Sequence, residues 1–82
     1  MKRVNELGYY NLRFAGLAQK LDITTNQVTA LIRVLEIKSD EDCCMRIINT
    51  WCYSPEALTK MRAALEERPA LEWWQMYRDR NQ

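Results

Sequence analysis

The stretch FAGLAQKLDITTNQVTALIRVLEI, residues 14–37, predicts two short helices joined by a tight turn. Apolar residues recur at helical spacing on both sides of an interruption at residues 22–24. They are Phe14, Leu17, Ala18 and Leu21 before it, and Val28, Leu31, Ile32 and Leu35 after it. Thr24 is placed to cap the second helix, and Gln27, three residues on, completes a capping box. The first helix is expected to begin at Asn11 or Leu12, and the second to run from Thr25 to about Glu36.

This spacing resembles the helix-turn-helix of bacterial and phage DNA-binding proteins. In that family the second helix enters the major groove of DNA, and the first helix braces it on the backbone. The family usually has Gly at the first position of the turn, where φ is often positive, and this chain has Asp22 there. An ordinary pair of core helices is the alternative interpretation of the same pattern.

The resemblance implies that the second helix reads DNA with its outward face. At 100° per residue, four residues point away from the apolar stripe: Asn26, Thr29, Ala30 and Arg33. Asn pairs with adenine, Arg pairs with guanine or phosphate, and the methyl groups of Thr and Ala contact thymine. A solvated helix face normally carries more Glu and Lys than this one. The predicted DNA-contacting residues of this helix are Thr25, Asn26, Gln27, Thr29, Ala30 and Arg33.

Positive charge is concentrated in the first part of the chain, although the net charge is only +1 at pH 7. Residues 1–38 carry six Lys and Arg against three Asp and Glu, and residues 39–82 carry six against eight. Phosphate groups are therefore expected to meet the chain near the predicted helix pair. The residues predicted to contact them are Arg13, Lys20, Lys38 and Arg46.

Residues 39–53, SDEDCCMRIINTWCY, fit two interpretations. As a helix, the segment is capped by Ser39 and has an apolar stripe of Cys44, Ile47, Ile48 and Trp51. As a hairpin, strands over 43–48 and 51–53 flank a turn at Asn49-Thr50. The two interpretations place the protein in different fold classes.

The residues after this segment favour the hairpin. A helix pair, a short hairpin and then Tyr53-Ser54-Pro55-Glu56 resemble the winged helix-turn-helix of the MerR and excisionase group. In that group a tyrosine ends the wing, and Ser-Pro-Glu opens the next helix. The Arg- and Gly-rich wing sequence usual there is missing, since the segment has only Arg46. The resemblance implies a wing over residues 43–53.

Two further helices are predicted over residues 55–67 and 70–80. Ser54 at the N-cap and Pro55 at the first helical position begin the first of them, and Arg68-Pro69 ends it. Two pairs on its outer side are spaced for i,i+4 ion pairs: Glu56 with Lys60, and Arg62 with Glu66.

The apolar face of the last helix contains three large aromatic residues, Trp73, Trp74 and Tyr77. Either these rings cap the core of the monomer, or they form a surface for a homodimer or a partner protein. At the other end of the chain, residues 1–11 fit a short helix or an extended arm, interrupted at Gly8. Tyr9 and Tyr10 are expected in the core rather than on a DNA backbone.

Composition argues against an enzyme and against a bound metal or other cofactor. The chain has no His, its two Gly form no phosphate-binding loop, and its three Cys form no CxxC pair. Cys43, Cys44 and Cys52 are therefore expected to be buried free thiols. No apolar run approaches the ~20 residues that span a bilayer, and Met1-Lys2-Arg3 is followed by no apolar signal segment, so a cytoplasmic protein is expected.

The expected fold is mainly α with a small β-hairpin, a winged helix-turn-helix in one domain over residues 1–82, with a helix-turn-helix core at 12–37. An all-α helical bundle is the alternative fold. The expected function is non-catalytic binding of double-stranded DNA. The protein would be a prokaryotic or phage transcription regulator, an excision-type factor, or the recognition module of a larger DNA-processing or defence protein. A protein-interaction domain that does not bind DNA is the alternative function, favoured by the low net charge.

Overall fold

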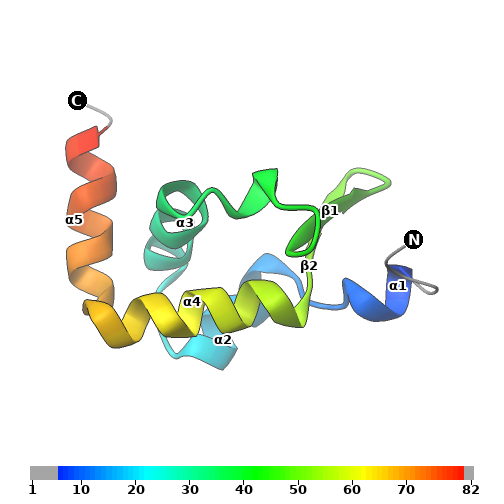
Figure 1. Ribbon diagram of the computed structural model, residues 1–82, viewed down its shortest axis with the longest axis horizontal. Coiled ribbons are helices and arrows are strands. Elements are labelled where there is room, and N and C mark those ends of the chain that lie inside the picture. Colours follow the sequence, from blue (N-terminus) through cyan, green and yellow to red (C-terminus); the bar gives the residue numbers. More distant parts are fainter. Residues whose placement is uncertain (1–5, 81–82) are drawn as a thin grey trace.

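Short helices and one hairpin make up residues 6–80, the part of the chain that the computed structural model describes (Figure 1). In chain order they are α1 (Glu6–Tyr9), α2 (Phe14–Leu21), α3 (Thr25–Val34), the 3₁₀ turn η1 (Ile37–Ser39), β1 (Cys44–Ile47), β2 (Thr50–Tyr53), α4 (Pro55–Glu67) and α5 (Ala70–Arg80). The fold is mainly helical with a two-stranded antiparallel sheet, in one domain. This confirms the predicted fold class, and the all-helical alternative is wrong. The predicted N-terminal segment before Glu6 lies outside the described residues.

The turn between α2 and α3 has the predicted geometry. The Thr24 hydroxyl accepts a hydrogen bond from the Gln27 amide at 3.1 Å, and the Thr24 amide donates to Gln27 Oε1 at 3.0 Å, so the capping box is complete. Asp22 has φ 57° and ψ 47°, the left-handed conformation for which the resemblance predicts Gly. The Ile23 amide then donates to the Ala18 carbonyl at 3.1 Å, which closes the end of α2.

Both helices of this pair are shorter than predicted. α2 begins at Phe14, because the backbone of Leu12 is engaged in a bridge with Tyr53. The Leu12 amide donates to the Tyr53 carbonyl at 3.0 Å, and the Tyr53 amide donates to the Leu12 carbonyl at 2.7 Å. α3 ends at Val34, because Glu36 has φ 56° and turns the chain into η1. The bridge at Leu12 attaches the hairpin to the start of α2.

The hairpin is confirmed, but its turn lies one residue earlier than predicted. Ile47 pairs with Thr50, so the turn is Ile48-Asn49 rather than Asn49-Thr50. In an antiparallel pair, residues directly opposite each other share a face of the sheet. The observed register pairs buried Cys44 with buried Tyr53 and leaves exposed Arg46 opposite Trp51. The predicted register would instead have set the charged Arg46 against the buried Tyr53 ring. Moving the two-residue turn by one position shifts the strand pairing by two residues, so each side chain stays on the same face but has a different partner.

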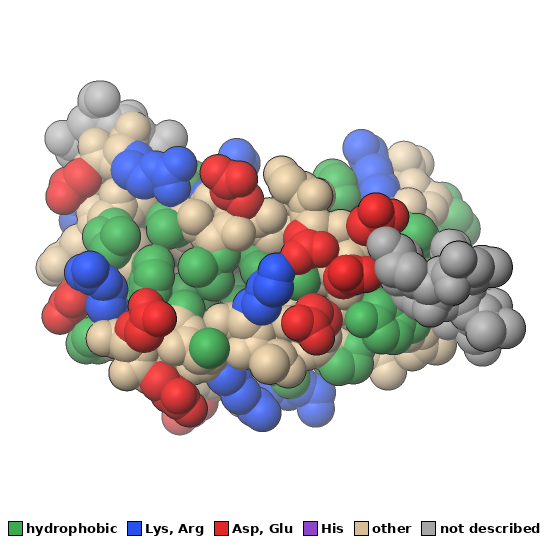
Figure 2. All heavy atoms as spheres, viewed as in Figure 1, with side chains coloured by type: hydrophobic (Ala, Val, Ile, Leu, Met, Phe, Trp, Pro, Cys, Tyr) green, Lys and Arg blue, Asp and Glu red, His purple; other side chains and the backbone are tan. Residues whose placement is uncertain are grey.

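The core lies where α2, α3, α4 and α5 converge on the base of the hairpin. Its fully buried side chains include Leu17, Leu31, Ile37 and Met61. α5 packs mainly against α3, and Figure 1 shows α5 rising from the end of α4 with α3 beside it. Hydrophobic side chains gather between these three helices (Figure 2). A hollow of about 240 Å³ opens there, lined by Leu35, Lys60, Ala63, Ala64, Glu67 and Trp73.

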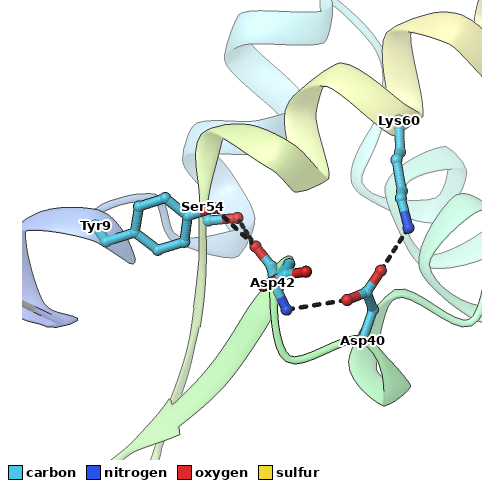
Figure 3. Close-up of polar contacts among 5 residues, drawn as sticks. All are labelled: Tyr9, Asp40, Asp42, Ser54 and Lys60. Atoms are coloured by element: carbon cyan, nitrogen blue, oxygen red, sulfur yellow. Dashed lines mark hydrogen bonds and ion pairs between the residues drawn. The ribbon is translucent and has the colours of Figure 1, made fainter. Parts of the chain in front are cut away.

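Polar contacts secure the loop that leads into β1 (Figure 3). The Asp42 carbonyl accepts hydrogen bonds from the Ser54 hydroxyl and from the Tyr9 hydroxyl, the latter at 3.2 Å. The Asp40 carboxylate accepts from the Asp42 amide at 2.9 Å and forms an ion pair with Lys60 of α4. The loop is therefore attached to α1, to the start of α4 and to the middle of α4.

Long-range contacts replace the local side-chain bonds expected in α4. Ser54 occupies the N-cap position, as predicted, but its hydroxyl makes no capping bond and donates to the loop carbonyl instead. Lys60 pairs with Asp40 rather than with Glu56, and Arg62 donates to the Lys20 carbonyl at 3.3 Å. Spacing along one helix identifies neighbours on that helix only, whereas these partners come from elsewhere in the chain.

Candidate nucleic-acid interface

α3 presents a narrow polar face to solvent. Thr25, Asn26 and Arg33 are exposed, and Thr29 is half-buried with its hydroxyl donating to the Thr25 carbonyl at 3.1 Å. No acidic residue lies within α3. A helix face of this composition presents an amide, a guanidinium and hydroxyl groups, which are the groups that pair with base edges and phosphates.

Ala30 was predicted on this outward face, and that prediction is wrong, because Ala30 is fully buried. The reason is a second packing partner: α3 contacts α5 as well as α2, so two sides of the helix are covered. Gln27 is restricted in another way, since its Oε1 atom already accepts the Thr24 amide in the capping box. The solvent-exposed face of α3 is thus narrower than the face predicted from the 100° spacing of its residues.

A basic cluster forms where η1 meets the hairpin, and we define it as Lys38 and Arg46 around the Trp51 ring. Lys38 Nζ lies 4.6 Å from the ring centroid, and Arg46 Cζ lies 5.8 Å from it. The register of the sheet sets Arg46 directly opposite Trp51, while Lys38 comes from η1. The negative face of an indole ring attracts cations at such distances. Trp51 therefore holds two positive charges together that would otherwise repel each other.

A groove of about 550 Å³ lies beside this cluster. It is lined by Arg13, Phe14, Ala15, Lys38, Asn49, Thr50, Trp51 and Tyr53, from the start of α2, from η1 and from the hairpin. Arg13, at the N-cap of α2, makes no side-chain capping bond, and the first turn of α2 has no acidic residue. The walls of the groove thus carry positive charge, polar side chains and three aromatic rings.

The structure brings together three of the four residues predicted to contact phosphate, namely Arg13, Lys38 and Arg46. Lys20 lies apart from them, in the last turn of α2, where its carbonyl accepts from Arg62 of α4. Sequence reasoning missed Trp51, Asn49 and Thr50 as lining residues. The sequence would indicate these residues only through the cross-strand pairing of Arg46 with Trp51, and that pairing can be predicted only if the strand register is correct.

Several acidic side chains lie together outside the lining of the groove. Figure 2 shows several of them around the middle of one face. The sequence places three in the loop before β1 (Asp40, Glu41 and Asp42) and another, Glu56, in the first turn of α4. The lining of the groove and this acidic region therefore carry charges of opposite sign.

The cysteines are shielded rather than reactive. Burial raises the pKa of the Cys43 thiol and of the Cys44 thiol to about 11 each, and Cys52 is also buried and free. A thiol with so high a pKa is protonated at neutral pH and is a poor nucleophile. Among residues 6–80, no group of three or more His, Cys, Asp or Glu is arranged to hold a metal ion.

The aromatic residues of α5 have separate environments. Trp73 is only 6% exposed, and its Nε1 atom donates to the Ala64 carbonyl at 3.0 Å. Trp74 and Tyr77 are half-buried, with ring centroids 5.7 Å apart, and Leu71 is 56% exposed. The Trp73 ring thus belongs to the core of the monomer, and only its neighbours along α5 are accessible to a partner.

None of the helices between Glu6 and Arg80 combines the length and apolarity needed to cross a membrane. Neither the search of curated proteins nor the search of solved structures returned a significant match. The family described as "Domain of unknown function (DUF8610)" matches residues 8–79, which include α2 through the hairpin to α4 and nearly all of α5. The match therefore contains both the polar face of α3 and the basic cluster, and the chain belongs to the DUF8610 family.

Proposed function

We propose that this domain binds double-stranded DNA without catalysing a reaction, as a winged helix-turn-helix of the MerR and excisionase kind. α3 lies in the major groove, with Asn26 and Arg33 facing base edges. Arg13, Lys38 and Arg46 contact phosphates beside it. The observation that carries the proposal is the meeting of Lys38 and Arg46, from separate elements, over Trp51 and next to the groove that Arg13 lines.

Charge explains why this arrangement favours a polyanion. Each cation that neutralises a phosphate releases a counterion, and binding weakens as salt rises, with a slope of about −0.9 per contact. The three clustered cations therefore give a slope of roughly −3, and Arg33 adds one more contact if it meets a phosphate.

The site is suited to recognition rather than to chemistry. Its groups are a guanidinium, an amide, hydroxyls and an ammonium, which bind and orient nucleic acid, and the buried cysteines are not among the residues that line it. We place the domain in the cytoplasm of a prokaryote or of a phage-infected cell. It acts there as a small transcription regulator, as an excision-type factor, or as the recognition module of a larger DNA-processing or defence protein.

A titration of labelled mixed-sequence duplex DNA at low salt, followed by fluorescence anisotropy, tests the proposal. The wild-type protein is expected to bind with the salt slope given above. Lys38→Ala should weaken binding on every sequence and reduce the slope by about one. Arg33→Ala, if Arg33 reads a base, should cost ~1–3 kcal/mol on a preferred site selected from random DNA, and should flatten the preference at one position.

The matched control is Arg78→Ala, which removes an exposed cation from α5 and should change neither affinity nor preference. Each variant must retain the far-ultraviolet spectrum of the folded protein. Unchanged binding in folded Arg33→Ala and Asn26→Ala would remove α3 as the reading element. No binding by the wild-type protein at low salt would overturn the function itself.

The second candidate is a protein-interaction domain, and the surface of α5 favours it. Leu71 is 56% exposed and lies one turn from Trp74, whose ring contacts Tyr77. Accessible aromatic and aliphatic side chains of this kind mark contact surfaces for a partner or a second copy of the chain. The two functions are compatible, since α5 and the hairpin are separate elements on either side of α3 (Figure 1).

A further inference from the structure

The tip of the hairpin carries an exposed aliphatic side chain. Ile48 is 89% exposed and is the first residue of the two-residue turn between β1 and β2. Leu71, the other large exposed hydrophobic residue in the described part of the chain, is only 56% exposed. The core and the side chains packed against it, as far as the structure describes them, do not include Ile48. Packing of the monomer therefore gives no reason for an isoleucine here.

The backbone at this position also disfavours isoleucine. Ile48 has φ 58°, a conformation that suits Gly, Asn or Asp in two-residue hairpin turns and strains a β-branched residue. Such strain is commonly found at positions that serve a function. The ladder continues up to the pair Ile47–Thr50, so the two-residue turn projects directly from the paired end of the hairpin.

The surroundings of the tip indicate what it meets. Arg46 lies two residues before Ile48 and extends over Trp51 with Lys38, while Asn49 and Thr50 line the groove beside them. The tip is thus an apolar point on a positively charged and polar base. That combination fits a polyanion with an apolar interior. Duplex DNA is such a molecule, because its phosphates lie outside and its stacked bases lie inside.

We propose that Ile48 is a wedge that enters the minor groove and inserts between two adjacent base pairs. The inference rests on the proposed function. It adds a contact in the minor groove, across the phosphates that Lys38 and Arg46 bind, to the contact of α3 in the major groove. Aliphatic side chains inserted in this way partly unstack a base step and kink the duplex by roughly 20–90° toward the major groove. The kink brings the neighbouring major groove around α3.

The wedge also selects DNA sequence without a hydrogen bond. Pyrimidine–purine steps such as TpA unstack most easily, so the domain should prefer one at the position under the hairpin tip. The preference arises from the deformability of the DNA, and it is therefore separable from any base that Arg33 reads.

The experiment uses two duplexes of about 30 base pairs that differ only in a central step, TpA or ApA, with donor and acceptor dyes at their ends. Wild-type protein is expected to raise energy transfer on the TpA duplex and to bind it more tightly than the ApA duplex. Ile48→Asn suits the positive φ but removes the aliphatic group. It should abolish the rise in energy transfer, remove the preference for TpA and weaken binding about tenfold, equivalent to about 1.4 kcal/mol.

Two further variants make the result specific to the tip. Ile48→Leu keeps an aliphatic side chain and should retain the bend. Leu71→Asn makes the same kind of change on the exposed surface of α5, and should alter neither the bend nor the affinity. If Ile48→Asn fails to fold, Ile48→Gly replaces it, because glycine accepts this backbone without strain.

The outcomes separate this inference from the proposed function. Binding without a bend, or an equal bend by wild-type and Ile48→Asn, would overturn the wedge, while loss of affinity in Arg33→Ala would still support reading by α3. A loss of self-association in Ile48→Asn, with DNA binding unchanged, would assign the tip to a protein contact instead. If the wild-type protein binds neither duplex at low salt, the proposed function fails and the wedge fails with it.

Discussion

Three described residues other than glycine have positive φ, and each lies where the chain changes direction: Asp22 between α2 and α3, Glu36 before η1, and Ile48 at the hairpin tip. A left-handed backbone costs an ordinary L-residue about 1–2 kcal/mol, and less for Asp or Asn. Only the first position was foreseen, because the resemblance identifies that turn. Glu36 and Ile48 are residues whose own preferences give no indication of a positive φ.

Glu36→Gly is expected to stabilise the fold. Glycine removes the steric cost of φ 56°, although it also makes the unfolded chain more flexible. The net gain in free energy of unfolding should be about 0.5–1 kcal/mol, measured by urea denaturation. Asp22→Gly is the matched comparison and should gain less, since Asp tolerates this conformation better. A lower unfolding midpoint for Glu36→Gly would show that the glutamate side chain makes a stabilising contact that outweighs the strain.

At the scale of elements, local signals predicted most of the fold. The capping box, Pro55 at the start of α4 and the helix stop at Arg68-Pro69 act within a few residues, and the observed boundaries at Thr25, Pro55 and Ala70 follow them. Contacts between distant elements account for the differences. The Leu12–Tyr53 bridge shortens α2, and packing of α5 on α3 buries Ala30.

The same division applies to the candidate site. The identities of Arg13, Lys38 and Arg46 as cations near the helix pair are visible in the sequence, and two of them line the groove. Their arrangement around Trp51 is not visible, because it depends on a strand register that differs by two residues from the predicted one. Lys20 has the same charge and a similar position along the chain, yet it lies on the side of α4.

The ion pair between Asp40 and Lys60 joins two elements and predicts a dependence of stability on pH. The hydrogen bond from Lys60 lowers the pKa of the Asp40 carboxyl below 3.8, and Asp40 in turn raises the pKa of Lys60 above 10.5. A lowered carboxyl pKa stabilises the fold at pH above 3.8, and the effect is lost as the pH falls through the folded-state value. A raised lysine pKa stabilises it below 10.5, and the effect is lost as the pH rises through the folded-state value.

Lys60→Gln should therefore lower the thermal midpoint slightly between pH 5 and pH 9, because both charges are solvent-accessible and the pair is weak. The difference from the wild-type protein should shrink as the pH falls from 3.8 through the lower folded-state pKa of Asp40. Arg62→Gln on the same helix is the control, and its effect should not follow the titration of Asp40. A constant difference between wild type and Lys60→Gln from pH 3 to pH 9 would mean that the lysine stabilises through its methylene groups alone.

At the scale of the whole molecule, the domain has two distinct ends on either side of α3. The hairpin carries the basic cluster and the exposed Ile48, whereas α5 carries the half-buried Trp74 and Tyr77 (Figure 1). A small domain buries few side chains, and the Trp73 ring of α5 is one of them. The adjacent tryptophans Trp73 and Trp74 therefore provide a direct test of which side of α5 belongs to the fold.

Trp73→Ala is expected to impair folding, whereas Trp74→Ala is expected to impair association. Trp73 is buried and hydrogen-bonded to Ala64, so its truncation should cost about 3–5 kcal/mol and leave little folded protein. Trp74→Ala should change the free energy of unfolding by about 1 kcal/mol or less, because the ring is partly solvated. In sedimentation equilibrium, Trp74→Ala should dissociate any homodimer formed through α5, while Arg78→Ala should not. Equal destabilisation by the two tryptophan variants would place both rings in the core and remove α5 as a surface for a partner.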